Sequence, residues 1–314
     1  MLNRLSNGWP ALAGVVMVAL LTLMRSVDPA PVSSLRGSGF DALQRLWPRA
    51  MPEAQPVRII DIDEASLNEV GQWPWPRSTL AALTNELVDL GAAVVAYDIV
   101  FPEPDRMSPR RILAAPEVQD ALKTASASLD ASVLPDNDEA FASAIRGRPV
   151  VLAFASSGAS LTAHPPIKAG FAQTGEDALD AAPRLAGITT NLPLLDAAAA
   201  GVGSMNVSLA SEGGVARQIP FLLGDGSRLY PSLAAEALRV AQGAETLLVR
   251  ASPDTKNAIE SLVVGDLEIP LSEAGLFYVY YRPDPRDLYV PAAKVLSGKT
   301  QEVKVVLDGN KPDG

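Results

Sequence analysis

Three aspartates at the ends of apolar segments are the first residues in this sequence that could carry chemistry. Asp61 and Asp63 end the segment Val57-Arg58-Ile59-Ile60-Asp61-Ile62-Asp63, and Asp98 lies within the apolar segment 93–101. Carboxylates at the carboxyl ends of neighbouring parallel strands can bind a divalent cation, an amine or sugar hydroxyls. They can also cap the next helix and accept hydrogen bonds from loop amides, and we favour this structural role.

Two tryptophans and an arginine follow on one proline-rich loop, Gly71-Gln72-Trp73-Pro74-Trp75-Pro76-Arg77. Proline fixes its own φ and drives the preceding residue into an extended conformation, so we expect a stiff, nearly straight ribbon. Trp73, Trp75 and Arg77 could form one wall of a cleft for a planar, apolar or anionic ligand. Alternatively, the rings anchor the loop to the core and Arg77 pairs with a strand-end aspartate. Both interpretations can hold at once.

The composition excludes several kinds of site. The 314 residues include no cysteine, which rules out disulfides, thiolate metal ligands and cysteine nucleophiles. The single histidine, His164, lies in a proline-rich loop, so neither a Ser-His-acid triad nor a histidine-rich zinc site is expected. The net charge of −10 argues against nucleic acid as a partner and against adsorption on anionic lipid. We expect no cofactor, no metal ion and no catalytic residue.

Regular elements must position these residues. Apolar segments at 58–62, 93–101 and 149–155 predict buried strands, and leucines at helical spacing predict a helix over 77–90. A right-handed βαβ unit is the economical interpretation of the first two strands and this helix. We expect an α/β fold with a mixed, largely parallel sheet and flanking helices. Further helices are predicted at 40–46, 108–129, 137–146 and 230–242, strands at 201–207, 215–223, 247–249, 261–264, 267–269, 276–282 and 302–307, a strand and short helix at 288–296, and a surface loop at 156–182.

The N-terminal segment predicts a membrane anchor. No charged residue occurs from Leu5 to Met24, and a helix of about 20 residues spans one hydrocarbon core. Because no small-x-small cleavage site follows, we favour an uncleaved signal anchor, an N-terminal transmembrane helix within residues 1–27, over a signal peptide. Residues 28–39 are rich in Pro, Ser and Gly and predict a linker. Residues 40–307 would form the main domain, and 308–314 a polar tail.

The order of these pieces resembles a known family. Ile-Ile-Asp-Ile-Asp at 59–63, Gly-x-Trp-Pro-Trp-Pro-Arg at 71–77, an amphipathic helix and the apolar segment 91–101 are similar to the CHASE type 2 family, extracytoplasmic sensory domains of bacterial cyclases and kinases. The resemblance extends more weakly to about Gly298. The segment 206–220 resembles the family's strand–turn–strand followed by an arginine, here Arg217, although Glu212-Gly213-Gly214 replaces the usual Asp-Gly turn.

The resemblance implies a sensory domain held at the inner (plasma) membrane, with the residues after about 27 extracytoplasmic. It implies detection of a small-molecule ligand or a periplasmic partner, possible homodimers, and control of a cyclase or kinase not present in this chain, which we expect to be a fragment. Two alternatives stay open: a membrane-anchored, metal-dependent periplasmic hydrolase that uses clustered aspartates, and a ligand-free dimerisation module. The candidate ligand-binding residues are Asp61, Asp63, Trp73, Trp75, Arg77, Asp98 and Arg217.

Overall fold

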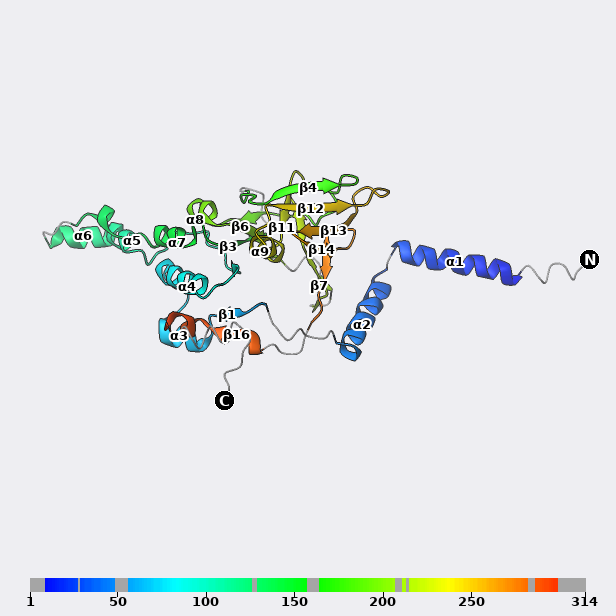
Figure 1. The fold of residues 1–314 in the computed structure, drawn as a ribbon, viewed down its shortest axis with the longest axis horizontal. Coiled ribbons are helices and arrows are strands. Elements are labelled where there is room, and N and C mark those ends of the chain that lie inside the picture. Colours follow the sequence, from blue (N-terminus) through cyan, green and yellow to red (C-terminus); the bar gives the residue numbers. More distant parts are fainter. Residues whose placement is uncertain are drawn as a thin grey trace, which may run out of the picture.

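The computed structural model describes residues 9–27, 29–48, 56–125, 129–156, 164–206, 211–212, 215–281 and 286–298. The chain is a mixed α/β protein with several small sheets, and helix α1 (Trp9–Val27) extends away from its body (Figure 1). Within the described part of the chain, no helix combines the length and the apolar character that crossing a bilayer requires. The predicted transmembrane helix within residues 1–27 is therefore not supported.

A short parallel sheet holds the first core. Strand β3 (Val150–Ser156) lies at its centre and pairs in parallel with β2 (Val95–Tyr97) and β6 (Gly201–Ser204). The two-residue strand β5 (Ile188–Thr189) pairs antiparallel with the end of β3. Residues 150–154 are all fully buried, which explains why this strand reads as one continuous apolar run.

Strand β1 does not join β2 as the predicted βαβ unit requires. β1 (Ile59–Asp61) instead pairs in parallel with β16 (Tyr289–Pro291), from the far end of the described chain. Helix α10 (Ala292–Leu296) follows β16 and contacts both α3 (Glu64–Val70) and α4 (Arg77–Asp89). The prediction was wrong because the apolar pattern identifies each strand but carries no information about which strand lies beside it.

A second, four-stranded sheet is mostly antiparallel, in the order β14-β13-β12-β4. Gly265, with φ of 56°, forms the turn between the predicted strands 261–264 and 267–269. Strand β4 lies in the region predicted as a loop and pairs in parallel with β12. The predicted α/β class with mixed strand pairing is confirmed, but the strands form several small sheets instead of one largely parallel sheet. The bounds are β4 (Gly170–Thr174), β12 (Thr246–Ala251), β13 (Ile259–Val264) and β14 (Leu267–Pro270).

Short strand pairs and helices complete the fold. The predicted helix over 108–129 is interrupted before Pro116. Proline has no N–H to continue the hydrogen bonds of a preceding helix, but it fits the first turn of a new one, and Pro116 begins the second helix. The predicted strand 302–307 and the tail 308–314 lie outside the described residues. The remaining elements are α5 (Pro109–Ala114), α6 (Pro116–Thr124), η2 (Ala131–Val133), α7 (Asn137–Ile145), α8 (Pro193–Ala198), β7 (Ser211–Glu212), β8 (Val215–Ala216), β9 (Gln218–Pro220), β10 (Leu222–Gly224), β11 (Leu229–Pro231), β15 (Leu276–Tyr278) and η4 (Arg286–Leu288).

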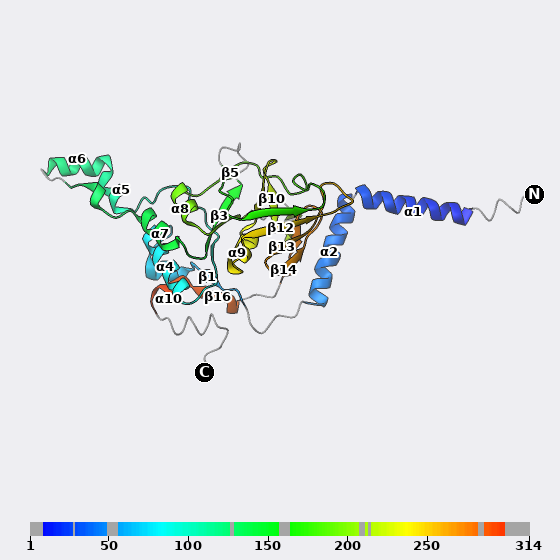
Figure 2. The same ribbon diagram turned by 45° about the horizontal axis from the view of Figure 1, so that its top comes forward.

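Helix α9 (Leu233–Ala241) connects the two sheets, because it contacts β3 and β6 of the first and β13 of the second (Figure 2). Ser232 caps it by accepting a hydrogen bond from the Ala235 N–H. A Cβ at Gly203 would lie 2.7 Å from the Leu233 Cα, so glycine is needed for this close approach of helix and strand.

Helix α2 (Ala30–Leu46) replaces the linker predicted at 28–39 and includes the predicted helix 40–46. Proline occupies its first turn, where the missing N–H costs nothing. Its glycines and serines disfavour a helix in isolation. The helix forms because its C-terminal half packs against the segment after β15, and such tertiary contacts routinely override local propensity.

The close approach of α9 to β6 makes a stability prediction. Gly203→Ala should lower the free energy of unfolding by about 1–3 kcal/mol, because the added methyl group meets backbone that cannot move alone. The control Gly39→Ala, on α2, has nothing within 4 Å of its new Cβ and should be neutral or stabilising. Urea unfolding measures both variants, and equal midpoints for wild type and Gly203→Ala would contradict the prediction.

Candidate functional site

Asp63 has the capping role that the sequence analysis favoured. It is the N-cap of α3, and its Oδ1 accepts a hydrogen bond from the Ser66 N–H at 2.8 Å. Hydrogen bonds from Ser66 lower the pKa of the Asp63 carboxyl. The Ser66 hydroxyl in turn accepts from the Ala293 N–H, which ties α3 to α10. The side chain of Asp63 is therefore used in holding these two helices in place.

Asp61 and Asp98 belong to different sheets. Asp61 ends β1, which pairs with β16, whereas Asp98 is exposed and follows β2 in the parallel sheet. Among the residues described, no group of three or more His, Cys, Asp or Glu side chains is close enough to hold a metal ion. The three aspartates therefore do not form the cluster that the hydrolase alternative needs.

The two tryptophans have different environments. Trp75 is 1% exposed, and its Nε1–H donates a hydrogen bond to the Gly71 carbonyl at 2.7 Å. Trp73 is 40% exposed and meets Trp75 edge to face, with ring centroids 6.1 Å apart. The chain bends at residues 72–74, so the loop is not the straight ribbon expected. Trp75 is thus the core anchor, and only Trp73 presents a ring to solvent.

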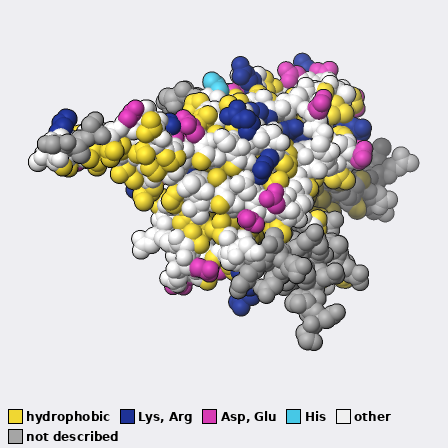
Figure 3. Space-filling view, turned by 60° about the vertical axis from the view of Figure 1, so that its left-hand side comes forward, with side chains coloured by type: hydrophobic (Ala, Val, Ile, Leu, Met, Phe, Trp, Pro, Cys, Tyr) yellow, Lys and Arg dark blue, Asp and Glu magenta, His cyan; other side chains and the backbone are white. Residues whose placement is uncertain are grey.

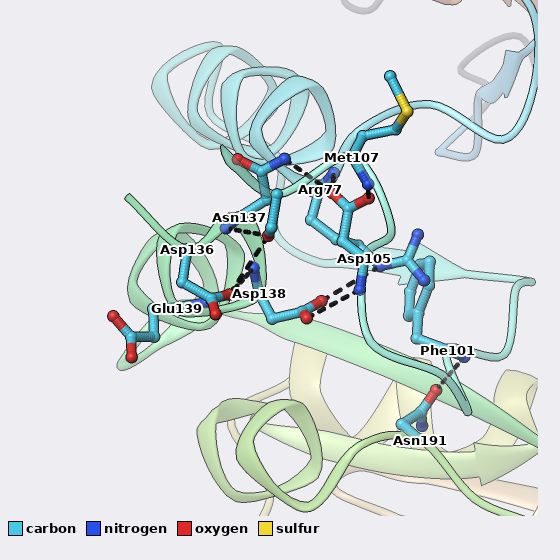
Figure 4. Close-up of polar contacts among 10 residues, drawn as sticks. Arg77, Phe101, Asp105, Met107, Asp136, Asn137, Asp138, Glu139 and Asn191 are labelled. Atoms are coloured by element: carbon cyan, nitrogen blue, oxygen red, sulfur yellow. Dashed lines mark hydrogen bonds and ion pairs between the residues drawn. The ribbon is translucent and has the colours of Figure 1, made fainter. Parts of the chain in front are cut away.

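Arg77 begins α4 and points into a polar cluster (Figure 4). Its Nε lies 3.8 Å from Asp138 Oδ1, and its guanidinium stacks over the Phe101 ring, 4.4 Å from the centroid. Burial lowers the pKa of Arg77, and the nearby carboxylate of Asp138 opposes this shift. The expected partner of Arg77 was a strand-end aspartate; the structure instead supplies Asp138, from the start of α7.

Asp105 is the centre of this cluster, and the sequence analysis did not single it out. Its Oδ2 accepts from the Arg77 N–H and the Asn137 side-chain amide, and its Oδ1 accepts from the Met107 N–H. Its own N–H donates to Asp138 Oδ2 at 2.9 Å. Asp105, Asn137 and Asp138 are all buried. The cluster joins the N-termini of α4 and α7 and the loop after β2, which is a structural role.

Arg217 belongs to a second cluster, in which its guanidinium contacts helix α2. Its Nε and Nη2 donate to the two carboxylate oxygens of Asp41, at 3.0 and 2.9 Å. A Cβ at Gly37 would lie 3.2 Å from the Arg217 Cζ, so the glycine lets the guanidinium lie against the helix. This two-pronged ion pair fixes α2 to the bend between β8 and β9, where Arg217 lies.

Gln44 reinforces the same contact. Its Nε2 donates to the Val279 carbonyl at 3.2 Å, and its Oε1 accepts from the Tyr281 N–H at 3.0 Å. One side-chain amide thus satisfies the backbone edge of residues 279–281 as a neighbouring strand would. Phe40 adds ring contacts with Tyr278 and Tyr280, at centroid distances of 5.4 and 5.8 Å. We call the contacts of Phe40, Asp41 and Gln44 with Arg217 and residues 278–281 the α2 clamp.

His164 also has a partner that the sequence did not reveal. The single histidine lies at the surface near basic side chains (Figure 3). Its Nδ1 is 3.2 Å from Asp225 Oδ2, which also accepts from the Tyr230 hydroxyl at 2.9 Å. Burial raises the pKa of Asp225, but hydrogen bonds from Ser227, Tyr230 and Arg228 outweigh it and bring the pKa to about 2.

The two tryptophans give a matched pair of variants. Trp75→Ala should lower the free energy of unfolding by about 3–5 kcal/mol, because it removes a fully buried ring. Trp73→Ala should cost less than about 1 kcal/mol, because its ring already contacts water. Urea denaturation of the two variants separates these outcomes. Equal losses of stability would mean that Trp75 is not the core anchor.

The α2 clamp predicts a pH dependence. Hydrogen bonds from Arg217 lower the pKa of Asp41 below its unfolded value. A carboxyl with a lowered folded pKa stabilises the folded state above its unfolded pKa and loses this effect as pH falls through the folded pKa. Residues 30–46 should therefore stay docked at neutral pH and exchange amide hydrogens faster below about pH 4.

Hydrogen exchange, corrected for the intrinsic rate, measures this release, with the buried strand residues 150–154 as the internal control. Arg217→Ala should raise exchange in α2 already at neutral pH and remove most of the difference between neutral and acid pH. If exchange in α2 rises equally in wild type and Arg217→Ala on acidification, the ion pair does not hold the helix.

Comparison with known proteins places the chain in a family. A family model described as the CHASE2 domain matches residues 14–311, which is nearly the whole chain. The match includes the segments 59–63, 71–77 and 91–101. It confirms the resemblance to the CHASE type 2 family that these segments indicated. No curated protein and no solved structure matches the chain. With the family model covering the sheets, helix α4 and the α2 clamp, the chain belongs to the CHASE2 domain family.

Proposed function

We propose that this chain is the sensing part of a receptor of the inner membrane and that it lies outside the cytoplasm. CHASE2 domains are extracellular sensory domains and are not themselves catalytic. The stimulus is a small molecule or a periplasmic protein, and the receptor acts as a homodimer. The output is an adenylate or guanylate cyclase, a diguanylate cyclase or a protein kinase.

The α2 clamp is the observation that carries this proposal. Among the described residues, its contacts between the N-terminal helices and the sheet-bearing body include an ion pair, a side-chain amide and an aromatic ring. The side chains of Asp41 and Arg217 are 26% and 21% exposed, so water can replace their hydrogen bonds at low cost. A contact of this kind can exist in docked and released states, and a stimulus can shift the balance between them.

Two other functions have weaker support. A hydrolase would need Asp61, Asp63 and Asp98 around a metal ion, and within the described residues they do not gather. Asp63 is also committed to capping α3. A dimerisation module without a ligand remains a separate outcome of the experiment below, because it predicts a constant dimer and no response to small molecules.

A thermal-shift screen of metabolites and ions against the whole chain tests the proposal. At 100 times its Kd, a ligand that binds only the folded state stabilises it by about 2.7 kcal/mol. We expect at least one compound to raise the Tm saturably by about 2 °C or more, and the same compound to change hydrogen exchange in residues 30–46.

Three results would contradict the sensory role. The first is a complete screen without a saturable shift. The second is a constant dimer whose α2 exchange no compound alters. The third is hydrolysis of a substrate that is lost in Asp63→Asn while the fold is intact. Asn is as good an N-cap as Asp, so this variant keeps α3 capped and isolates a catalytic effect.

A further inference from the structure

A cleft opens beside the α2 clamp, between α2 and the segment after β15. Its cavity has a volume of about 270 Å³ and is partly open to solvent. The lining residues come from both sides: Phe40, Leu43, Gln44, Trp47, Tyr280 and Tyr281. Four of these six side chains are aromatic, and none carries a charge at neutral pH.

Two polar groups of the lining, the Gln44 amide and the Tyr281 hydroxyl, are already hydrogen-bonded within the protein. Both ends of the Gln44 amide are hydrogen-bonded to the backbone of residues 279 and 281. The Tyr281 hydroxyl donates to the Ala216 carbonyl at 2.8 Å. Asp41, next to Phe40 in the chain, is paired with Arg217. The cleft therefore offers a ligand mainly ring faces, ring edges and the aliphatic side chain of Leu43.

We propose that this cleft binds a neutral, planar ligand of one or two rings. The inference rests on the proposed function and names its binding site and ligand class. The volume is just below the range of pockets that take drug-sized molecules, which limits the ligand to a small ring system. Aromatic side chains accept another ring by offset stacking or edge to face. An anion is disfavoured, because no lining residue supplies an opposite charge.

The position of the cleft connects ligand binding to the clamp. Phe40, Leu43 and Trp47 project from α2, whereas Tyr280 and Tyr281 belong to the segment held by Gln44. A bound ring touches both sides only when α2 is docked. It therefore binds the docked state more tightly and shifts the chain toward it.

Indole is a suitable probe, and isothermal titration calorimetry of the whole chain measures its binding. We expect one saturable site per chain, with a Kd of roughly 1 mM or tighter, and slower hydrogen exchange in residues 30–46 when indole is bound. Leu43→Trp places a bulky ring in the cleft and should weaken indole binding at least about tenfold. A tenfold change in Kd corresponds to about 1.4 kcal/mol, which calorimetry can measure. The matched control Leu35→Trp, on the same helix at another exposed leucine, should bind indole as the wild type does.

A second variant covers the case in which Leu43→Trp fails to fold. Trp47 is 72% exposed, so Trp47→Ala should leave the fold intact and weaken indole binding at least about fivefold. Circular dichroism verifies the fold of each variant. Acetate, a small anion, should not compete with indole.

Several results would overturn the cleft as the site. They are the absence of saturable indole binding, equal affinity in wild type, Leu43→Trp and Trp47→Ala, or competition by acetate. A compound from the thermal-shift screen whose affinity is the same in Leu43→Trp and Leu35→Trp would also overturn it, while leaving the sensory role intact. Failure of the screen itself would instead reject the proposed function.

Discussion

Helix α9 has to touch both sheets at once, and this double contact determines how the two halves of the chain are placed. Gly203 lets the helix approach β6, and Glu236 and Arg239 form a fully buried, two-pronged ion pair on its inner face. Arg239 also donates to the carbonyls of Ala200 and Ala244, which lie just before β6 and β12. A buried ion pair is tolerated only when its hydrogen bonds are satisfied. Through these two bonds, the Arg239 side chain also links the start of one strand in each sheet.

Short strands leave many backbone groups to be satisfied by side chains. Strands of two to seven residues make few ladder bonds, and buried polar residues supply the rest. Asn191 accepts from the Phe101 N–H and donates to the Ala153 carbonyl and to Asp196. Burial raises the pKa of Asp196, and the hydrogen bond from Asn191 opposes the rise. Asp105 has the corresponding role between α4 and α7. These residues belong to the core as much as the leucines do.

Two polar clusters in the chain suit different purposes. The cluster of Arg77, Asp105 and Asp138 is largely buried, and breaking it would leave charges without partners away from water. The ion pair of the α2 clamp is partly exposed, so water can replace its hydrogen bonds at a lower cost. A sensory domain needs a contact that a stimulus can shift by a small free energy. In the function proposed above the clamp is this contact, whereas the residues around Trp75 and Arg77 are suited to holding the core rigid.

The sequence alone determined the elements whose signals lie within a few residues. Helix α4, strand β3 and the capping role of Asp63 were all readable from periodicity and capping chemistry. It also excluded cysteine chemistry and carried the segments that the CHASE2 domain family shares. Only the tertiary structure decided that β1 pairs with β16 and that Asp138 faces Arg77. It also decided that residues 30–39 are part of a helix, α2, whose C-terminal half packs against the segment after β15. The physical reason is that pairing depends on the burial and charge compensation gained between residues far apart in the chain, and no local pattern records that gain.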